Sequence, residues 1–209
     1  MTDIQFVYFD LGKILLAFDH AIGFRGIAKE LDVPVAKVQA LLDEQGLRNR
    51  YESGQVTTDE FLDTIAKHFF PEQAMSPERR RRLFEVSGEI FWPIESMIGI
   101  IDRVRAKGIG VGILSNTCEI HWQAIQRGGF EVLKNPADVE VLSFRCGAMK
   151  PAVQIYEFAE RACAAAPENI LFIDDKEENI VAARARGWNA EHTFGGPEAI
   201  GVLERYRVV

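Results

Sequence analysis

The sequence predicts an α/β fold: a doubly wound, Rossmann-like parallel sheet that carries an inserted, small α-helical domain. From residue 93 onward, short apolar runs alternate with segments of helical spacing, as in folds with parallel sheets. Between residues 16 and 92 helical spacing continues and strand signals are missing. The 209 residues are 47% hydrophobic and 26% charged, which suits one globular core with an insertion. The expected division is a core of residues 1–15 and 93–209 and a helical cap of residues 16–92.

The core elements follow from apolar runs and from turn residues at their ends. The expected strands, rich in β-branched and aromatic residues, are residues 4–9, 109–114, 139–143, 170–173 and 188–192. The segments between them have helical spacing, and Gly108 and Gly187 follow two of them at positions typical of a helix end. The expected core helices are residues 94–107, 115–127, 152–165, 177–186 and 197–206.

The insertion is expected to hold four helices. Thr57-Thr-Asp-Glu60 is a capping box, which indicates a helix that continues through Phe70. Ser76-Pro77 indicates another, because proline is favoured at the first helical position. The remaining two are expected at residues 20–31 and 35–47, the second broken near Gly46.

Composition excludes several classes of function. The net charge of -7 argues against a nucleic-acid partner, which usually meets a basic face. No apolar run is long enough to span a membrane, and no signal-peptide pattern stands at the N-terminus. The three cysteines form no CxxC pair, so they indicate neither a disulfide framework nor a zinc site. A reducing, cytoplasmic location and a small-molecule partner are therefore expected, for a monomer or a homodimer.

Polar clusters follow three of the expected strands. They are Asp10, then Ser115-Asn116-Thr117, then Asp174-Asp175; a fourth group, Lys150-Pro151, precedes a helix. Because parallel strands end at one edge of a sheet, these groups are expected to converge.

The clustered groups suit a phosphate ligand. Three carboxylates in one crevice would repel one another without a cation, and hard oxygen ligands favour Mg²⁺. Ser115 and free N–H groups after the strand suit an anion, and Lys150 supplies a point charge for a phosphoryl group. The three clusters that follow strands each also fit the start of a helix, and Lys150 before Pro151 is a weak signal alone, but the four in this order indicate a catalytic site.

The motifs resemble those of the haloacid dehalogenase (HAD) superfamily of phosphohydrolases. They are Phe-Asp10-Leu-Gly-Lys-Ile, Leu-Ser115-Asn-Thr, Met-Lys150-Pro and Phe-Ile-Asp174-Asp175-Lys-Glu-Glu-Asn179, and the resemblance extends from Phe6 to about Gly187. The insertion resembles the small C1 cap of that superfamily. Within it, Tyr51-Glu-Ser-Gly54 resembles the cap of the sugar-phosphate phosphatase branch, which includes α-glucose-1-phosphate phosphatases.

The resemblance implies an Mg²⁺-dependent hydrolase of a small phosphomonoester, with a sugar phosphate as the expected substrate. Asp10 would attack phosphorus and form an aspartyl-phosphate that water then hydrolyses. Ser115 and the Asn116 N–H would hold the transferring phosphoryl group, and Lys150 would bridge to Asp10.

The resemblance also implies the ligands of the metal. Asp10, the backbone carbonyl of Gly12 and Asp175 would bind Mg²⁺, and Asp174 would serve as a further ligand or as an outer-shell acceptor. The metal would neutralise charge as it develops.

Gly12 departs from the family pattern, because most phosphatases of the superfamily carry there a second Asp that acts as general acid and base. Such a group is typically worth about 10²–10⁴-fold in rate. Three interpretations stay open: the substrate has a good leaving group, the cap supplies the acid from Asp19, His20 or Glu52, or the protein is a weak or inactive relative.

The role of Lys13 stays open, and three histidines are interpreted as structural. Lys13 could meet the substrate or point to solvent, and the second is favoured. His68, His121 and His192 stand alone in helix or strand patterns and are interpreted as structural.

Three rival functions use similar parts. A phosphoreceiver domain carries its acidic pair on the first strand, whereas here the pair comes last. A 2-haloacid dehalogenase carries Tyr where this chain has Gly12, and Asp175 would have no metal to bind. A non-enzymatic binding protein on the same scaffold is the third alternative.

Overall fold

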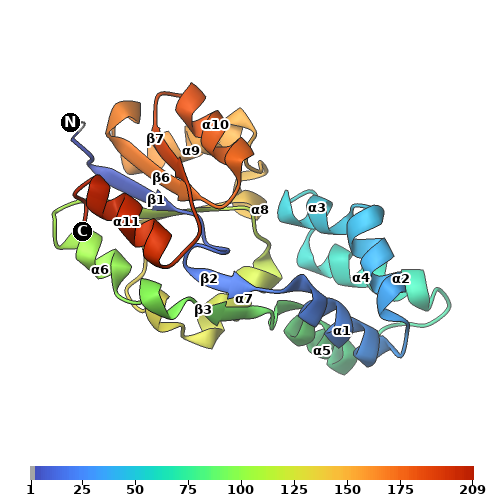
Figure 1. Ribbon diagram of the computed structural model, residues 1–209. Helices are drawn as coiled ribbons and strands as arrows, with labels where there is room; N and C mark the ends of the chain where they lie inside the picture. Colours follow the sequence, from blue (N-terminus) through green and yellow to red (C-terminus); the bar gives the residue numbers. More distant parts are fainter. Residues whose placement is uncertain (1–2) are drawn as a thin grey trace.

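The computed structural model describes residues 3–209 as an α/β core and a helical lobe joined by a short β-ribbon (Figure 1). The central sheet has five strands in the order β5-β4-β1-β6-β7, and all neighbouring pairs are parallel. The strands are β1 (Phe6–Phe9), β4 (Gly110–Ser115), β5 (Val139–Leu142), β6 (Ile170–Asp174) and β7 (Asn189–His192). The predicted doubly wound parallel sheet is confirmed; of the predicted core segment 1–15, residues 1 and 2 lie outside the described residues.

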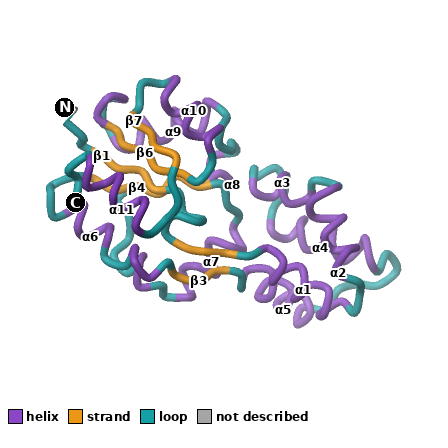
Figure 2. Tube along the Cα trace, viewed as in Figure 1, coloured by secondary structure: helices purple, strands orange, loops and turns teal. Residues whose placement is uncertain are grey.

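Helices cover both faces of the sheet (Figure 2). One face packs against α6 (Ile100–Arg105), α7 (Glu119–Gly128) and α11 (Pro197–Arg205). The other face packs against α9 (Val153–Cys163) and α10 (Glu177–Ala185). Since both faces are buried, the inner strands β1, β4 and β6 are nearly continuous apolar runs, whereas the edge strands β5 and β7 contain polar residues.

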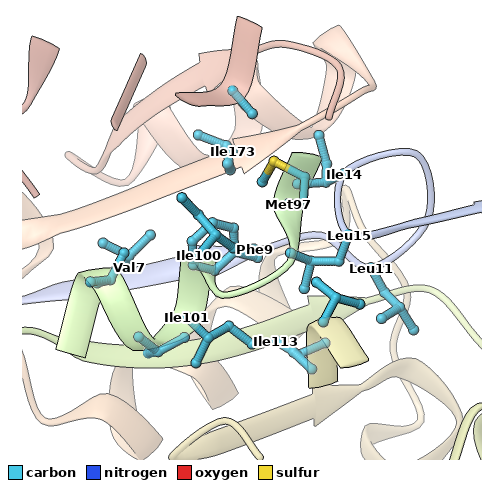
Figure 3. Packing of buried hydrophobic residues seen from close by; sticks show 14 of the residues in the cluster. Val7, Phe9, Leu11, Ile14, Leu15, Met97, Ile100, Ile101, Ile113 and Ile173 are labelled. Carbon is cyan, nitrogen blue, oxygen red and sulfur yellow. The ribbon is translucent and has the colours of Figure 1, made fainter. Parts of the chain in front are cut away.

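Strand β1 lies at the centre of the sheet and divides its side chains between the two faces. Val7 and Phe9 pack with Ile100, Ile101 and other residues on one face, as Figure 3 shows, and Phe6 and Tyr8 point to the other. The Tyr8 hydroxyl donates a hydrogen bond of 2.8 Å to the Ala159 carbonyl of α9. Asp10 follows directly, so the buried strand fixes where this carboxylate stands.

Two glycines in β4 make room for the aromatic residues of β1. A Cβ atom at Gly112 would lie 2.3 Å from Cε1 of Tyr8, and one at Gly110 would lie 2.4 Å from Cδ2 of Phe6. Real Cβ atoms do not approach ring carbons so closely, so the close packing of these neighbouring strands depends on glycine.

The lobe is an amphipathic helical bundle with a core of its own. Its helices are α1 (His20–Leu31), α2 (Val35–Gln39), α3 (Leu47–Glu52), α4 (Thr58–Phe69) and α5 (Pro77–Gly88), with a π-helical turn over Ala40–Glu44. The predicted capping box is present: the Thr57 N–H donates to Glu60 Oε2 at 2.7 Å, and the Glu60 N–H donates to Thr57 Oγ1 at 3.2 Å. Ser76 caps α5 by accepting from the Arg79 N–H at 3.2 Å, and Pro77 begins that helix.

The sequence predicted no strand between residues 16 and 92, and this prediction is wrong at both ends of the range. Strand β2 (Leu16–Phe18) pairs antiparallel with β3 (Phe91–Pro93) and forms the ribbon between core and lobe. Each strand has three residues, too few for a period of two to show, and its partner is distant in the sequence.

Some predicted helices are shorter than expected. The segment 94–107 contains a 3-10 turn (Glu95–Met97), and Gly99, at φ 78°, separates it from α6. Helix α7 begins at Glu119, so residues 116–118 form a loop after β4. Short helical segments were not predicted at α8 (Ser143–Cys146), Glu131–Leu133 and Pro167–Asn169.

Within residues 3–209, no helix has the length and apolar character needed to cross a lipid bilayer.

The glycine packing in β4 yields a stability prediction. Gly112→Ala is expected to lower the free energy of unfolding by about 1–3 kcal/mol, because the new methyl group overlaps the Tyr8 ring. Gly201→Ala is the matched control: that glycine lies in α11 with open space around its Cα, so alanine should raise stability by about 0.5–1 kcal/mol. Urea unfolding followed by circular dichroism measures both. Equal effects of the two substitutions would contradict the packing argument.

Candidate active site

A cavity of about 210 Å³ opens where the strand ends of the core face the helical lobe. The core contributes the ends of β1, β4 and β6, as expected for a parallel sheet. The lining includes most of the predicted site residues: Asp10, Gly12, Ser115, Asn116, Lys150 and Asp175. The structure thus brings these residues together, and Asp174 lies fully buried behind them.

Lys150 stands at the centre of the site, and each of its three ammonium protons has an acceptor. Its Nζ atom lies 2.9 Å from Asp10 Oδ1, 2.6 Å from Asp174 Oδ2 and 2.7 Å from the Leu114 carbonyl. The side chain is 1% exposed. One buried cation therefore ties together the ends of β1, β4 and β6.

Burial and charge compete at this cluster. Burial alone would lower the pKa of Lys150, but the carboxylates of Asp10 and Asp174 outweigh it, so the pKa of the lysine is raised. The pKa of Asp10 is also raised, chiefly by burial, although Lys150 and the Leu11 N–H favour its charged form. A further cation beside Asp10 would lower the pKa of its carboxyl group and favour its nucleophilic form.

The three aspartates could hold a divalent cation. Asp10, Asp174 and Asp175 each offer a carboxylate oxygen, and these oxygens all lie within 4.8 Å of one another. An all-oxygen set of this size suits a hard ion such as Mg²⁺. Asp174 already accepts hydrogen bonds from Lys150 and from the Asn179 side-chain amide at 3.0 Å. It is therefore better placed to orient the site than to bind a metal ion directly.

The loop after β4 is locked to the segment that carries Lys150. The Asn116 side chain donates to the Lys150 carbonyl at 2.9 Å and accepts from the Lys150 N–H at 2.7 Å. The Thr117 N–H donates to Ser143 Oγ at 2.9 Å. These bonds fix the backbone beside Ser115, so its hydroxyl and the neighbouring N–H groups stand in a preset loop.

Position 12 has no room for a side chain in this structure. A Cβ atom on Gly12 would lie 2.5 Å from Cε1 of Phe18, whose ring occupies that space. Phe18 belongs to β2, the strand that sequence reasoning missed, and it also lines the cavity. The absence of a carboxylate at position 12 is therefore built into the packing.

The lobe closes the cavity with polar and aromatic side chains. His20 Nε2 lies 2.9 Å from Arg48 Nη1, and since arginine only donates, this nitrogen accepts and the imidazole is neutral. Burial, followed by the charge of Arg48, lowers the pKa of His20 to about 4. Burial likewise lowers the pKa of His121 to about 3, with His20 and Arg48 adding to the effect.

Sequence reasoning missed part of this lining. His121 was interpreted as structural, yet it lines the cavity, and so do Arg48, Asn49 and Phe91. No local motif marks these residues, because tertiary packing brings them together from three places: Arg48 and Asn49 from the lobe, Phe91 from the ribbon and His121 from the core helix α7. Lys13, which was expected to favour solvent, is half exposed and places its Nζ 2.9 Å from Asp175 Oδ2.

The central cation yields a stability prediction. Lys150→Met is expected to lower the free energy of unfolding by about 3–5 kcal/mol at about pH 8 in EDTA, because Asp10 and Asp174 lose their buried counterion. The pKa of Asp10, which burial already raises, would then rise further, so the loss should shrink as the pH falls and Asp10 takes up a proton. Urea unfolding at several pH values measures it, with the exposed Lys107→Met, which lies away from the cavity, as control, expected within about 0.5 kcal/mol of wild type. A loss as small as that of the control would contradict the role of the buried cation.

Comparison with known proteins agrees with this geometry. A family model described as haloacid dehalogenase-like hydrolase matches residues 9–187. The chain is 23% identical over 202 residues to a D-ribitol-5-phosphate phosphatase of Bacteroides thetaiotaomicron, across 93% of this chain and 94% of that protein. A solved HAD family enzyme from the same bacterium has a TM-score of 0.81 at 19% identity, with 96% of this chain and 98% of that chain covered. That enzyme has also been solved in complex with magnesium and inorganic phosphate.

A third relative is an HAD-like family hydrolase from Porphyromonas gingivalis, with a TM-score of 0.78, 22% identity and 97% of both chains covered. These likenesses match the observed fold along nearly the whole chain. The predicted family and enzyme class are confirmed, since the family model alone covers most of the sequence. The chain belongs to the haloacid dehalogenase-like hydrolases.

Proposed function

We propose that this protein is an Mg²⁺-dependent phosphomonoester hydrolase that acts on a small phosphorylated metabolite through an aspartyl-phosphate on Asp10. The observation that carries the proposal is the buried Lys150 held between Asp10 and Asp174, with Ser115 and Asp175 on the same cavity. A carboxylate in such a setting can attack phosphorus, because the positive charges around it offset the charge of the incoming phosphate.

Each residue has a task in this proposal. An oxygen of Asp10 forms the new bond to phosphorus while the bond to the leaving alcohol oxygen breaks; water then cleaves the aspartyl-phosphate and releases phosphate. Ser115 and the Asn116 N–H hold the phosphoryl oxygens, and Lys150 balances their charge.

The metal would be held by Asp10, the Gly12 carbonyl and Asp175, with Asp174 behind them. These residues fit the group, since their carboxylate oxygens lie within 4.8 Å of one another. Mg²⁺ bound there would supply charge neutralisation at the phosphoryl group. The Bacteroides enzyme solved with magnesium and inorganic phosphate supports this choice of ion.

The substrate we propose is a sugar phosphate or polyol phosphate. The curated relative is a D-ribitol-5-phosphate phosphatase. The lobe faces the cavity with groups that bind hydroxyls, namely His20, Arg48 and Asn49, and the ribbon adds the aromatic rings of Phe18 and Phe91. Such a mixture of polar and aromatic side chains suits a polyhydroxylated ligand, so we propose that residues 16–92 act as the substrate cap.

Substitution of the nucleophile tests the proposal. Asp10→Asn is expected to lower phosphate release by at least about 10³-fold and to abolish covalent phosphorylation, while the fold is retained. The assay uses p-nitrophenyl phosphate and a panel of sugar and polyol phosphates with Mg²⁺, and intact-mass spectrometry detects the phosphoenzyme. The exposed Asp59→Asn is the matched control and should behave as wild type.

Other outcomes identify the rival functions. No turnover by the wild-type protein, and no effect of Asp10→Asn, would indicate a binding protein. Activity on 2-haloacids that survives EDTA would indicate a dehalogenase. Near-full phosphatase activity of Asp10→Asn would show that the site is wrongly placed.

A further inference from the structure

The proposed function, on which this inference rests, needs one more group besides Asp10: a general acid and base. An alcohol leaves phosphorus as an alkoxide unless an acid protonates it, and the later attack by water needs a base. Position 12 cannot supply this group, because it is glycine and Phe18 fills the space beside it. The proton donor must therefore come from elsewhere on the cavity wall.

Two of the three acidic or basic candidates at the lobe entrance are excluded by their contacts. Asp19 does not line the cavity; its Oδ1 accepts from the Ala21 N–H at 2.8 Å as the cap of α1. His20 is neutral and its Nε2 accepts from Arg48, so it holds no acidic proton there. Burial likewise lowers the pKa of His121, whose ring packs against that of His20.

Glu52 is the remaining candidate, and its backbone is tied to the phosphate-binding loop. It is the last residue of α3, and Ser143 Oγ donates to its carbonyl at 2.6 Å. The same Oγ accepts from the Thr117 N–H, two residues after Ser115. Ser143 is fully buried, so one hydroxyl fixes Glu52 relative to the loop that would hold the phosphoryl group.

The carboxyl group of Glu52 lies at the cavity wall with little contact with solvent. Its side chain is 11% exposed and lines the same cavity as Asp10 and Ser115. Burial, the largest effect, raises its pKa to about 7, although Arg48 and Lys176 favour the charged form and Asp43 opposes it. Arg48 Nη1 lies 3.9 Å away, too far for a hydrogen bond, and the buried Cys118 thiol is a further neighbour.

We propose that Glu52 of the cap is the general acid and base of this enzyme, in place of the carboxylate missing at position 12. In the first step, Asp10 attacks phosphorus, the bond to the leaving oxygen breaks, and the proton of Glu52 passes to that oxygen to give the free alcohol. In the second step, water attacks the phosphoryl group, its proton passes to the Glu52 carboxylate, and phosphate and free Asp10 result. Protons and charges balance over the cycle, and no other reactant is required.

The test separates proton transfer from binding by the choice of leaving group. p-Nitrophenolate is a stable anion and leaves without taking up a proton, whereas the alkoxide of a polyol needs a proton in order to leave. Glu52→Gln is therefore expected to lower kcat/KM on a polyol phosphate by about 10²–10³-fold and to change kcat/KM on p-nitrophenyl phosphate by less than about threefold. Glu52→Asp should recover part of the loss.

The pH profile gives a second measurement. With the polyol phosphate, wild-type kcat/KM should fall as the pH rises through about 7, because the acid loses its proton, and Glu52→Gln should lose this limb. Glu72→Gln is the matched control, since Glu72 is an exposed glutamate of the same lobe and does not line the cavity; both its selectivity and its profile should equal those of wild type.

Each result decides between the proposals. Equal losses on both substrates, or an alkaline limb that persists in Glu52→Gln, would overturn the role of Glu52 and leave the proposed function standing. Absence of wild-type turnover on both substrates would overturn the proposed function, and this role with it. Titration of ¹³C-labelled glutamate carboxyls by NMR gives a readout without turnover, and an ordinary pKa for Glu52 would also overturn the role.

Discussion

The site depends on one buried ammonium group. Lys150 brings a positive charge into a place where three strands end, and it is tolerated there because each of its protons meets an oxygen of a different strand end. Removing such a charge from water is expensive unless its partners are placed in advance. The buried strands β1 and β6, and the Asn116 bonds that hold the Lys150 backbone, provide that placement. The two carboxylates that lie against Lys150 are thereby held apart from one another and in a fixed orientation.

The helical lobe completes what the core leaves open. Close contacts outside the cavity lining fix its position over the strand ends. Helix α5 packs closely on α7 at Gly88, where a Cβ atom would lie 2.8 Å from that of Ala124, and Gly54 lies close to the Phe144 backbone. The lobe is therefore seated on the core by backbone contacts, and its own side chains are free to differ at the cavity. The lobe can therefore present side chains such as Glu52 to the strand ends without carrying the contacts that hold it in place.

Much of this structure could be predicted from the sequence, because its signals are local. The inner core strands β1, β4 and β6 are apolar runs, and the capping box at Thr57 is a four-residue pattern. The convergence of the polar clusters follows from strand ends that must share an edge. The ribbon β2–β3 could not be predicted in this way. Its pairing joins residues far apart in the sequence, and three residues show no period. Arg48 of the lobe and His121 of the core helix α7 were missed as cavity residues for the same reason: they reach the cavity only through the way the helices pack.

The contact between Gly12 and Phe18 limits the order in which such a site can change during evolution. A carboxylate at position 12 would collide with the ring as long as Phe18 stands, so that substitution is harmful by itself. Loss of the ring first would leave only a void, which a protein of ordinary stability can survive. A lineage that gains an acid at position 12 would therefore lose the ring at position 18 first and acquire the carboxylate afterwards. A lineage that loses the acid would make the two changes in the opposite order.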